Sequence, residues 1–492
     1  MRMMLDNIKI YVLNYFTMNL KRCIYKLFTF VLSLFVVVSI TGQPAFASVS
    51  GQDLLYGQTL SQHKLTLGNC PNITAQKAGL MDSAGNVIYE RNSLESGKIA
   101  SMTKIMTAII CCETCNMTDK LTISESAAKV GESSAGLNVG DTLTFDTALR
   151  SLLIPSGNDA AYAIAEYVGN NLIKNKDDRI IKAYTKKEDD KEEPIYIDNN
   201  IEAFSKLMNL KAEELGCKNT VFTNPHGLDD NTWESDAHSC AYDMLLIIKC
   251  AMQKNTIRDI VSGGSCNIEV ERNNTTKTLK LQSTDLLVGS YKGCIGVKTG
   301  VTDLAGACFA GACVDDNGNE IYTVVMHSDD ETQRFLDTQN LFEWYFNHIY
   351  NYKPQENTDE KMSSSIYDDE QEVGIVANVS LSDWCNSTIP VTTKDIDSHI
   401  PVLTFAGNIF TKIDDTNVGG NYNCGDYVCD LIILQHNNEV GRLPLYAAKD
   451  QKSPNIFELV GVGVNRLINS ITNSQQRAES QIFSYSKNIA SK

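Results

Sequence analysis

The chain has 492 residues, of which 43% are hydrophobic and 21% charged, and its formal net charge is -17 at pH 7. This composition predicts a globular protein with at least two folded units and excludes a mainly disordered or collagen-like chain. An acidic chain lacks the basic footprint that phosphate binding requires, so nucleic acid is excluded as the main partner.

The N-terminal segment has the features of an export signal. Three basic residues precede an apolar core at residues 27–42, and an Ala-x-Ala site follows at residues 45–47. We expect residues 1–47 to be a signal peptide that is cleaved from an exported protein. An uncleaved membrane anchor is the alternative, although a spanning helix needs about 20 apolar residues.

The first folded domain is expected over residues 76–350, after a polar lead-in at residues 48–75. Two short apolar runs within residues 79–90 flank a turn and predict a hairpin. Residues 101–168 predict a helical region that Gly and Pro turns interrupt. Residues 173–199 are dense in charge and predict a solvated insertion.

The second half of this domain returns to strands. Apolar periodicity within residues 201–252 predicts further helices, and residues 331–349 predict a closing helix. Three strand-like runs lie between them, at residues 293–301, 306–314 and 321–327. Early and late strands around a helical middle predict an α+β fold with one antiparallel sheet built from both ends of the domain.

The C-terminal part is predicted to form a separate β domain. Residues 351–372 are polar and predict a linker or mobile edge, and short alternating runs over residues 373–452 predict a small all-β domain. Residues 453–492 predict a helix with one apolar stripe, formed by Ile456, Val460, Val464, Leu467 and Ile471. This stripe fits a membrane-surface helix or docking on the β domain equally well.

The cysteine content is high for an exported enzyme. The 15 cysteines permit disulfides outside the cell, but their pairing cannot be deduced from the sequence. Cys111, Cys112 and Cys115 lie in or beside an apolar run, and no second pair or nearby histidine completes a metal site. We interpret them as small buried hydrophobic residues and expect neither a metal nor another cofactor.

Three short motifs carry the candidate chemistry, in the order Ser101-Met102-Thr103-Lys104, Ser156-Gly157-Asn158 and Lys298-Thr299-Gly300. The S-x-x-K pattern alone is weak, since it also occurs at Ser61. Ser101, however, opens a strongly apolar helical run, where the positive end of the helix dipole favours developing negative charge.

Lys104 is the candidate base for Ser101. It lies one helical turn after the serine, so its amine can reach the hydroxyl. A lysine can take the proton only if burial or a nearby positive charge lowers its pKa, and Lys298 is a candidate source of that charge.

The other two motifs have ordinary interpretations as well. Ser156 could be a helix N-cap, and Lys298 could be a surface lysine on an edge strand. In the functional interpretation, Lys298 and Thr299 meet a substrate carboxylate, and Gly300 permits close approach of another backbone. His226 is a weak candidate for a Ser-His-Asp hydrolase, because no G-x-S-x-G elbow surrounds Ser101.

The sequence resembles the low-molecular-mass penicillin-binding proteins, which are serine-type D-alanyl-D-alanine carboxypeptidases. The resemblance includes the segments around the three motifs and a fourth, Thr223-Asn224-Pro225-His226-Gly227-Leu228-Asp229. It covers residues 75–350 closely and the β domain more loosely. It implies a penicillin-binding or serine β-lactamase-like fold: an antiparallel sheet flanked by helices, followed by a small all-β domain.

The resemblance also implies catalytic roles. Ser101 attacks the penultimate D-alanine carbonyl of a peptidoglycan stem peptide that ends in D-Ala-D-Ala, with Lys104 as its base. Backbone N–H groups of Ser101 and of Val301 or Thr302 form the oxyanion hole. Ser156 relays a proton, water hydrolyses the acyl-enzyme, and β-lactam antibiotics are trapped at the same serine.

Substrate-binding roles follow from the same resemblance. Asn158 orients Lys104 and holds the substrate amide, while Lys298, Thr299 and Gly300 form the site for the terminal carboxylate. The alternatives are a secreted serine β-lactamase, a transpeptidase and a non-catalytic wall-binding protein. No E-x-x-L-N segment lies between Ser156 and Lys298, which disfavours a class A β-lactamase.

Overall fold

The computed structural model describes residues 53–186, 192–229, 237–367, 369–382, 387–404, 408–414, 418–435, 438–472 and 480–484. The predicted signal peptide, residues 1–47, lies outside these ranges. Within them, no helix combines the length and the hydropathy that a membrane span requires.

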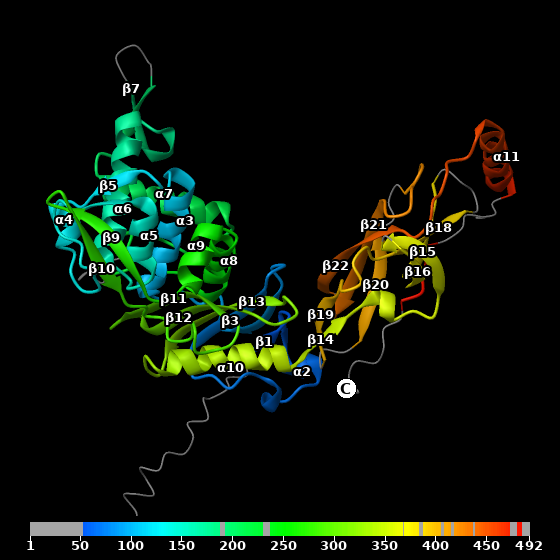
Figure 1. Ribbon diagram of the computed structural model, residues 1–492, viewed down its shortest axis with the longest axis horizontal. Coiled ribbons are helices and arrows are strands. Elements are labelled where there is room, and N and C mark those ends of the chain that lie inside the picture. Colours follow the sequence, from blue (N-terminus) through cyan, green and yellow to red (C-terminus); the bar gives the residue numbers. More distant parts are fainter. Residues whose placement is uncertain are drawn as a thin grey trace, which may run out of the picture. The chain divides into compact units, whose positions relative to one another are not determined.

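The first folded region, which follows the predicted signal peptide, is built on a seven-stranded antiparallel sheet with the order β11-β12-β13-β3-β4-β1-β2 (Figure 1). The strands in this order are β11 (Cys294–Thr302), β12 (Gly306–Val314), β13 (Glu320–Ser328), β3 (Lys77–Asp82), β4 (Val87–Arg91), β1 (Leu54–Leu55) and β2 (Gln58–Thr59). Strands from the two ends of the region meet where β13 pairs with β3. The predicted α+β fold, with one sheet assembled from both ends, is confirmed.

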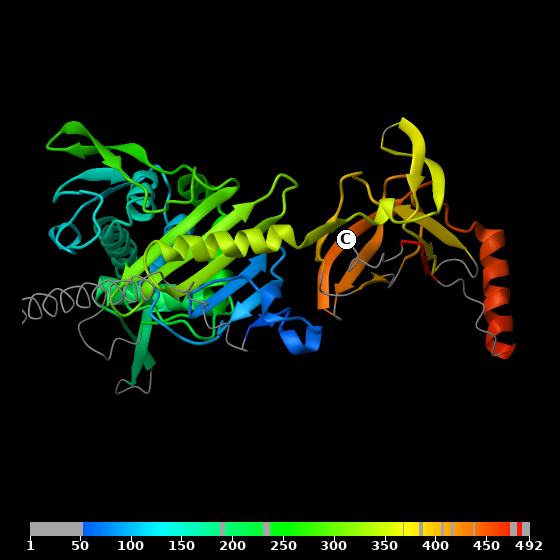
Figure 2. The ribbon, with the colours of Figure 1, turned by 90° about the horizontal axis from the view of Figure 1, so that it is seen from below.

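Helices cover both faces of this sheet. The helix α10 runs along one face, and α8 and α9 pack against the other (Figure 2). Because both faces are covered, the interior strand β12 is an uninterrupted buried run from Ala307 to Cys313. The helices are α2 (Leu60–His63), α3 (Lys104–Thr114), α4 (Glu125–Ala128), α5 (Phe145–Leu153), α6 (Asn158–Asn175), α7 (Asn200–Glu214), α8 (Ala241–Met252), α9 (Asn255–Ser262) and α10 (Gln333–Asn347).

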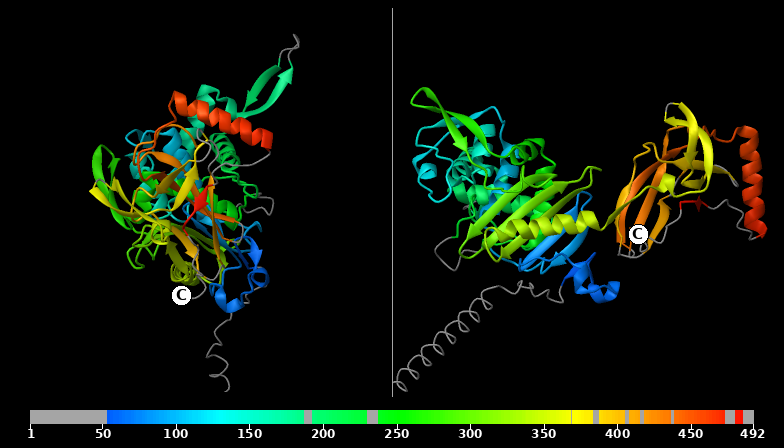
Figure 3. Two further views of the ribbon diagram at one scale, coloured as in Figure 1. Left: turned by 90° about the vertical axis from the view of Figure 1, so that its right-hand side faces the viewer. Right: turned by 60° about the horizontal axis from the view of Figure 1, so that its bottom comes forward.

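Two smaller sheets belong to the helical region. One has the order β10-β9-β6-β5, and the other is the hairpin β7–β8, which extends away from the helices (Figure 3). The hairpin corresponds to the predicted charged insertion at residues 173–199, although α6 continues to Asn175 before it begins. The strands are β5 (Lys120–Thr122), β6 (Thr142–Thr144), β7 (Ile181–Lys186), β8 (Glu192–Tyr196), β9 (Cys266–Arg272) and β10 (Thr275–Leu281).

The lead-in, residues 48–75, is more structured than the sequence predicted. Its described part, from Asp53 onward, forms β1, β2 and the short helix α2, and β1 pairs with β4. The carboxylate of Asp337 on α10 accepts hydrogen bonds from the backbone N–H groups of Thr74 and Ala75, each at 2.9 Å. These bonds join residues far apart in the chain, so local periodicity could not reveal them.

The C-terminal region is all-β apart from one helix. Its main sheet has the order β20-β21-β22-β18-β17-β23, and β14 pairs with β19. The elements are β14 (Ile349–Tyr352), β15 (Lys361–Tyr367), β16 (Asp369–Gly374), β17 (Ala377–Ser380), β18 (Thr388–Thr392), β19 (Ile400–Leu403), β20 (Ile409–Asp414), β21 (Tyr427–Gln435), β22 (Asn438–Ala447), α11 (Ile456–Thr472) and β23 (Gln481–Ile482).

The interpretation of residues 351–372 as a linker or mobile edge is wrong. Half of this segment belongs to the antiparallel ribbon β15–β16. Its inward positions, Ser364 and Ile366, are buried, and the Ser364 hydroxyl donates to the carbonyl of Ala448 at 2.6 Å. A polar segment can form such a strand because only alternate side chains face the interior.

The predicted C-terminal helix is α11, and most of the apolar residues described in its first part are exposed, although Val462 is buried. The side chains of Ile456, Phe457 and Val460 are 73%, 85% and 65% exposed. After α11 the chain returns to the sheet as β23, which pairs with β17. At its described positions, Ile456, Val460 and Val464, the predicted apolar stripe is therefore not docked on the β domain.

The cysteines in the described part of the chain are all free thiols, thirteen in number. Cys111 is fully buried in the helical core, while Cys112 and Cys115 are half-buried beside it. Within the same residues, no group of three or more His, Cys, Asp or Glu side chains is placed to hold a metal ion.

A buried ion pair joins the first described residue to the main sheet. Arg91 on β4 donates from Nε and Nη2 to the two carboxylate oxygens of Asp53, at 2.8 and 2.9 Å. Both side chains are almost completely buried, and the Tyr89 hydroxyl donates to the same carboxylate. Each charge is thus satisfied only while the other is present.

We predict that Asp53→Asn lowers the free energy of unfolding by about 3–5 kcal/mol, because it leaves the Arg91 guanidinium buried without its counter-charge. Urea denaturation measures this change. Glu271→Gln removes the exposed partner of Lys120 and should cost no more than about 1 kcal/mol. Equal, small losses in both variants would contradict the assigned role of the buried pair.

Candidate active site

Ser101 and Lys104 lie where the chain enters the helical core. Ser101 is in a 3-10 turn, Ala100–Thr103, that leads directly into α3, and Lys104 is the first residue of α3. Ser101 is half-buried, whereas Lys104 has no exposed surface. The hydroxyl therefore faces an accessible side of the fold while the amine beside it is shielded from water.

The Lys104 amine has two hydrogen-bond partners. Its Nζ lies 2.8 Å from Ser101 Oγ and donates to the carbonyl of His226, also at 2.8 Å. Burial, and then the positive charge of Lys298, lower the pKa of Lys104 well below its usual value. A neutral amine in contact with a serine hydroxyl is the arrangement required for general-base activation.

The fourth segment of the sequence resemblance, residues 223–229, packs against the Ser101 turn. The Asn224 Oδ1 accepts from the N–H groups of His226 and Gly227, at 3.2 and 2.6 Å, which fixes the turn. Gly227 has a φ of 86°, and a Cβ on it would lie 1.9 Å from the carbonyl oxygen of Ala100. Only glycine allows this approach, and the approach places the His226 carbonyl against Lys104.

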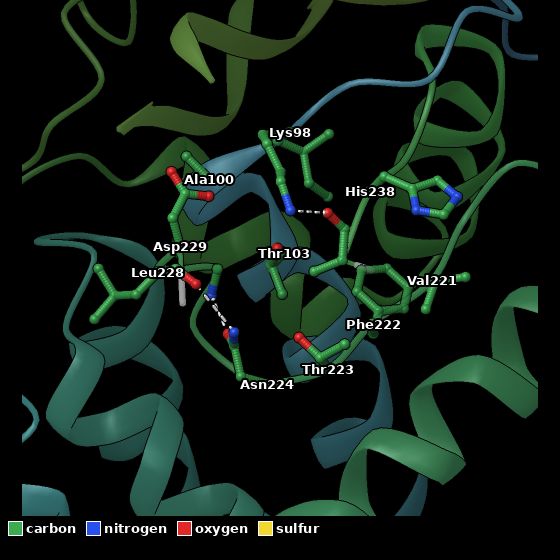
Figure 4. Close-up of a pocket in the computed structure, with 13 residues that line it drawn as sticks. Lys98, Ala100, Thr103, Val221, Phe222, Thr223, Asn224, Leu228, Asp229 and His238 are labelled. Atoms are coloured by element: carbon green, nitrogen blue, oxygen red, sulfur yellow. Dashed lines mark hydrogen bonds between the residues drawn. The ribbon is translucent and has the colours of Figure 1, made fainter. Parts of the chain in front are cut away.

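A small pocket lies between this segment and the Ser101 turn (Figure 4). Ala100 and Thr103 contribute to its walls from one side, and Phe222 and Asn224 from the other. Two lining residues are joined by a hydrogen bond, in which the Asn224 side chain donates to the carbonyl of Leu228 at 3.1 Å. The pocket is thus part of the packing that supports the nucleophile from behind.

The His226 side chain does not take part in a Ser-His-Asp arrangement. Its Nδ1 accepts from the N–H of Leu228 at 3.1 Å. Burial, and then the charge of Lys104, lower the pKa of His226 to about 3. The imidazole is therefore neutral and holds its own loop, while the backbone carbonyl of the residue contacts Lys104.

Ser156 and Asn158 have buried polar atoms without partners among the described residues. The Ser156 Oγ makes no hydrogen bond, and neither does the Asn158 Oδ1, although the Asn158 Nδ2 donates to Gly131 at 3.0 Å. The N-cap of α6 is Gly157, so the interpretation of Ser156 as a helix cap is wrong. Ser156 also has a φ of 65°, a rare conformation for serine.

The third motif lies on β11, the edge strand of the main sheet. Lys298 is almost fully buried, which excludes a surface lysine, and its Nζ donates to the Thr299 carbonyl at 3.0 Å. Burial, and then the charge of Arg334, lower the pKa of Lys298 to about 7, while Asp285 acts in the opposite direction. The pKa values of both lysines of the site are thus lowered, and that of Lys298 lies near neutral pH.

Gly300 allows close approach of a backbone segment from the same chain. A Cβ on Gly300 would lie 2.7 Å from the carbonyl oxygen of Ile99, just before the Ser101 turn. The next residue, Val301, is 46% exposed on the same strand and pairs with Ala307. Ser101 and β11 are therefore in direct contact, with the free edge of β11 beside the nucleophile.

Sequence reasoning missed two residues that contact the third motif and a third whose charge acts on Lys298. The Arg334 Nη1 donates to the Gly300 carbonyl at 3.1 Å, and the hydroxyls of Thr284 and Thr299 are 2.8 Å apart. Asp285 is within Coulombic range of Lys298. None of the three belongs to a motif, and only the tertiary fold brings them to β11.

Comparison with known proteins agrees with this geometry. The family profile described as D-alanyl-D-alanine carboxypeptidase (peptidase family S11) matches residues 64–175 and 196–330. The gap between the two matched ranges contains most of the β7–β8 hairpin, so this insertion lies outside the family pattern.

Similar individual proteins carry the same description. The D-alanyl-D-alanine carboxypeptidase DacF of Bacillus subtilis is 28% identical over 77% of this chain and 86% of its own length. DacA of Haemophilus influenzae is 28% identical over 68% of this chain and 74% of its own length. The structure of DacD from Francisella tularensis covers 78% of this chain and 94% of its own, with a TM-score of 0.50 and 18% identity, and it shows the fold alone.

The family profile covers half of the chain, and its matched ranges contain all three motifs. The protein therefore belongs to the D-alanyl-D-alanine carboxypeptidase family of serine peptidases, which act on peptidoglycan.

Proposed function

We propose that this protein removes the terminal D-alanine from peptidoglycan stem peptides through an acyl-enzyme on Ser101. The observation that carries the proposal is the fully buried Lys104 amine, 2.8 Å from Ser101 Oγ. A lysine with a lowered pKa in this position can accept the serine proton at neutral pH.

Acylation proceeds in two chemical events. The Ser101 hydroxyl gives its proton to the neutral Lys104, and Oγ attacks the carbonyl of the penultimate D-alanine. The backbone N–H groups of Ser101 and Val301 stabilise the resulting oxyanion, which accounts for several kcal/mol of barrier lowering in such sites. The contact of Gly300 with the backbone before Ser101 supports this pairing of donors.

Expulsion of the terminal D-alanine requires a proton on its nitrogen. Ser156 is the proposed relay from Lys104, because its buried hydroxyl has no other partner in the described part of the chain. The free Asn158 Oδ1 is the proposed acceptor for the substrate amide or for the lysine ammonium that forms. Water then hydrolyses the acyl-enzyme by the reverse use of the same groups.

The terminal carboxylate of the substrate binds at β11 in this proposal. The Lys298 ammonium and the Thr299 hydroxyl supply charge and a hydrogen bond, and Gly300 allows this strand to lie close to the Ser101 turn. A penicillin presents a similar carboxylate and a strained carbonyl, and it acylates Ser101 without rapid release.

We further propose that the mature enzyme works outside the cytoplasmic membrane and that α11 holds it at the membrane surface. The signal-like sequence of residues 1–47 supports export, and the exposed Ile456, Phe457 and Val460 support an interfacial helix.

The reaction is tested by intact-mass spectrometry with benzylpenicillin and by D-alanine release from a stem-peptide mimic. We expect a long-lived penicilloyl adduct and D-alanine release in the wild type, and neither in Ser101→Ala, whose peptidase rate falls by at least about 10³-fold because the nucleophile is absent. Asn340→Ala, at a half-buried polar position on α10 that no motif includes, is the control that retains both.

Other outcomes identify the alternatives. Rapid turnover of the drug without a lasting adduct would point to a β-lactamase. A folded wild type with neither adduct nor turnover would contradict a catalytic role for Ser101 and leave a wall-binding protein.

Membrane attachment is tested by co-sedimentation of the exported chain with phospholipid vesicles. We expect Phe457→Glu combined with Val460→Glu to reduce the bound fraction severalfold, because two charges enter the apolar face. Phe410→Glu on β20 is a matched control, since Phe410 is an equally large apolar residue that is 59% exposed elsewhere. Equal binding of all three proteins, or no binding by the wild type, would exclude this role for α11.

A further inference from the structure

The carboxylate site on β11 has an electrostatic problem that the proposed reaction does not solve. Lys298 is 99% buried and Arg334 is 94% buried, and the two cations are close enough that Arg334 lowers the pKa of Lys298. Two buried like charges destabilise each other and favour loss of the lysine proton. A neutral Lys298 would bind a substrate carboxylate poorly, so a counter-charge is needed.

Among the described residues, Asp285 is the one carboxylate that raises the pKa of both Lys298 and Arg334. Burial raises the pKa of Asp285, and the backbone hydrogen bonds of its turn and the charges of Lys298 and Arg334 offset this effect only in part. Asp285 in turn favours the charged form of each of the two cations. Its other titratable neighbour is the thiol of Cys294, whose pKa is raised to about 12 and which stays neutral.

The position of Asp285 is fixed by its own turn. Its Oδ1 accepts from the backbone N–H of Leu287 at 2.8 Å, and from that of Val288 at 3.4 Å. Its Oδ2 is buried and has no hydrogen-bond partner in the described structure. One oxygen therefore holds the turn, while the second remains available to a neighbouring donor.

The same turn is attached to two of the three motifs. The Thr284 N–H donates to the carbonyl of Ile154, two residues before Ser156, at 3.1 Å. The Thr284 hydroxyl lies 2.8 Å from the Thr299 hydroxyl on β11. The turn thus spans the substrate cleft from the Ser156 loop to β11, with Asp285 as its next residue.

Arg334 has a matching unsatisfied atom. Its Nη1 donates to the Gly300 carbonyl and its Nη2 to Glu331, whereas its buried Nε has no partner among the described residues. Asp285 Oδ2 and Arg334 Nε are thus both buried polar atoms without a hydrogen-bond partner among the described residues, and both belong to groups whose charges act on Lys298.

We propose that Asp285 is a positioning residue that keeps Lys298 cationic and holds Lys298 and Arg334 together for the terminal carboxylate of the substrate. This inference rests on the proposed function, because it assigns the carboxylate to β11. It predicts that Asp285 acts on substrate affinity and its pH dependence, and that it leaves the chemistry at Ser101 largely intact.

The test compares wild type, Asp285→Asn and Asp285→Glu by the pH dependence of kcat/KM for a D-Ala-D-Ala peptide. Asn keeps the Oδ1 that accepts from Leu287 and Val288, so it removes the charge and preserves the turn. Removal of a negative charge lowers the pKa of Lys298, so the alkaline limb of the profile should move to lower pH by about one unit or more.

Affinity should follow the same direction. Above pH 7 we expect Asp285→Asn to raise KM by about tenfold with a smaller change in kcat, because a lost ground-state contact appears mainly in KM. Asp285→Glu should recover part of the wild-type alkaline limb. Lys298→Arg should remove that limb altogether, because a guanidinium stays charged, and this variant identifies the titrating group.

Asp315→Asn is the matched control. Asp315 also holds a tight turn of the same sheet through its Oδ1, which accepts from the N–H groups of Asn317 and Asn319. It should keep the wild-type profile. An unchanged alkaline limb and KM in a folded Asp285→Asn would overturn the proposal, as would equal effects in Asp315→Asn.

Failure of the inference is distinguishable from failure of the proposed function. If the wild type releases D-alanine and forms a penicilloyl adduct while Asp285→Asn behaves like it, only the role of Asp285 is lost. If the wild type does neither, the assignment of the carboxylate to β11 falls as well.

Discussion

The active site depends on one buried amine. A lysine without exposed surface is costly to keep charged, and among the described residues Lys104 has only the Ser101 hydroxyl and the His226 carbonyl as hydrogen-bond partners. Both partners are satisfied by a neutral amine, and the nearby Lys298 further disfavours the ammonium form. The electrostatic constraint that makes a charged lysine costly at this position is thus the same one that supports the proposed role of Lys104 as a base.

The rest of the fold serves to enclose that amine. The turn before α3 is pressed between two backbone segments, at Gly227 on one side and Gly300 on the other, and each approach is too close for a Cβ. The sheet that carries Gly300 closes only when β13 pairs with β3, so strands from both ends of the region are required. The Ser101 turn and the motif on β11 are therefore brought together by long-range pairing, although each motif is local in sequence.

Much of this arrangement could be predicted from the sequence, and the failures have physical causes. The three late strands and the helical middle were predictable because their apolar patterns are strong and local. The ribbon at residues 361–374 was not, because alternating Ser and Glu side chains resemble a solvated linker until Ser364 and Ile366 are seen to be buried. Arg334 and Asp285 carry no local signal, since only the packing of α10 and of one turn brings their charges to Lys298.

The proposed mechanism requires that Lys104 is a neutral amine hydrogen-bonded to Ser101 in the resting enzyme. Neutron diffraction from ligand-free crystals at neutral pD measures this most directly, because deuterons on Nζ and Oγ become visible. We expect an uncharged Lys104 Nζ that accepts the deuteron of the Ser101 hydroxyl. A fully deuterated ammonium on Lys104 that donates to Ser101 Oγ would contradict it.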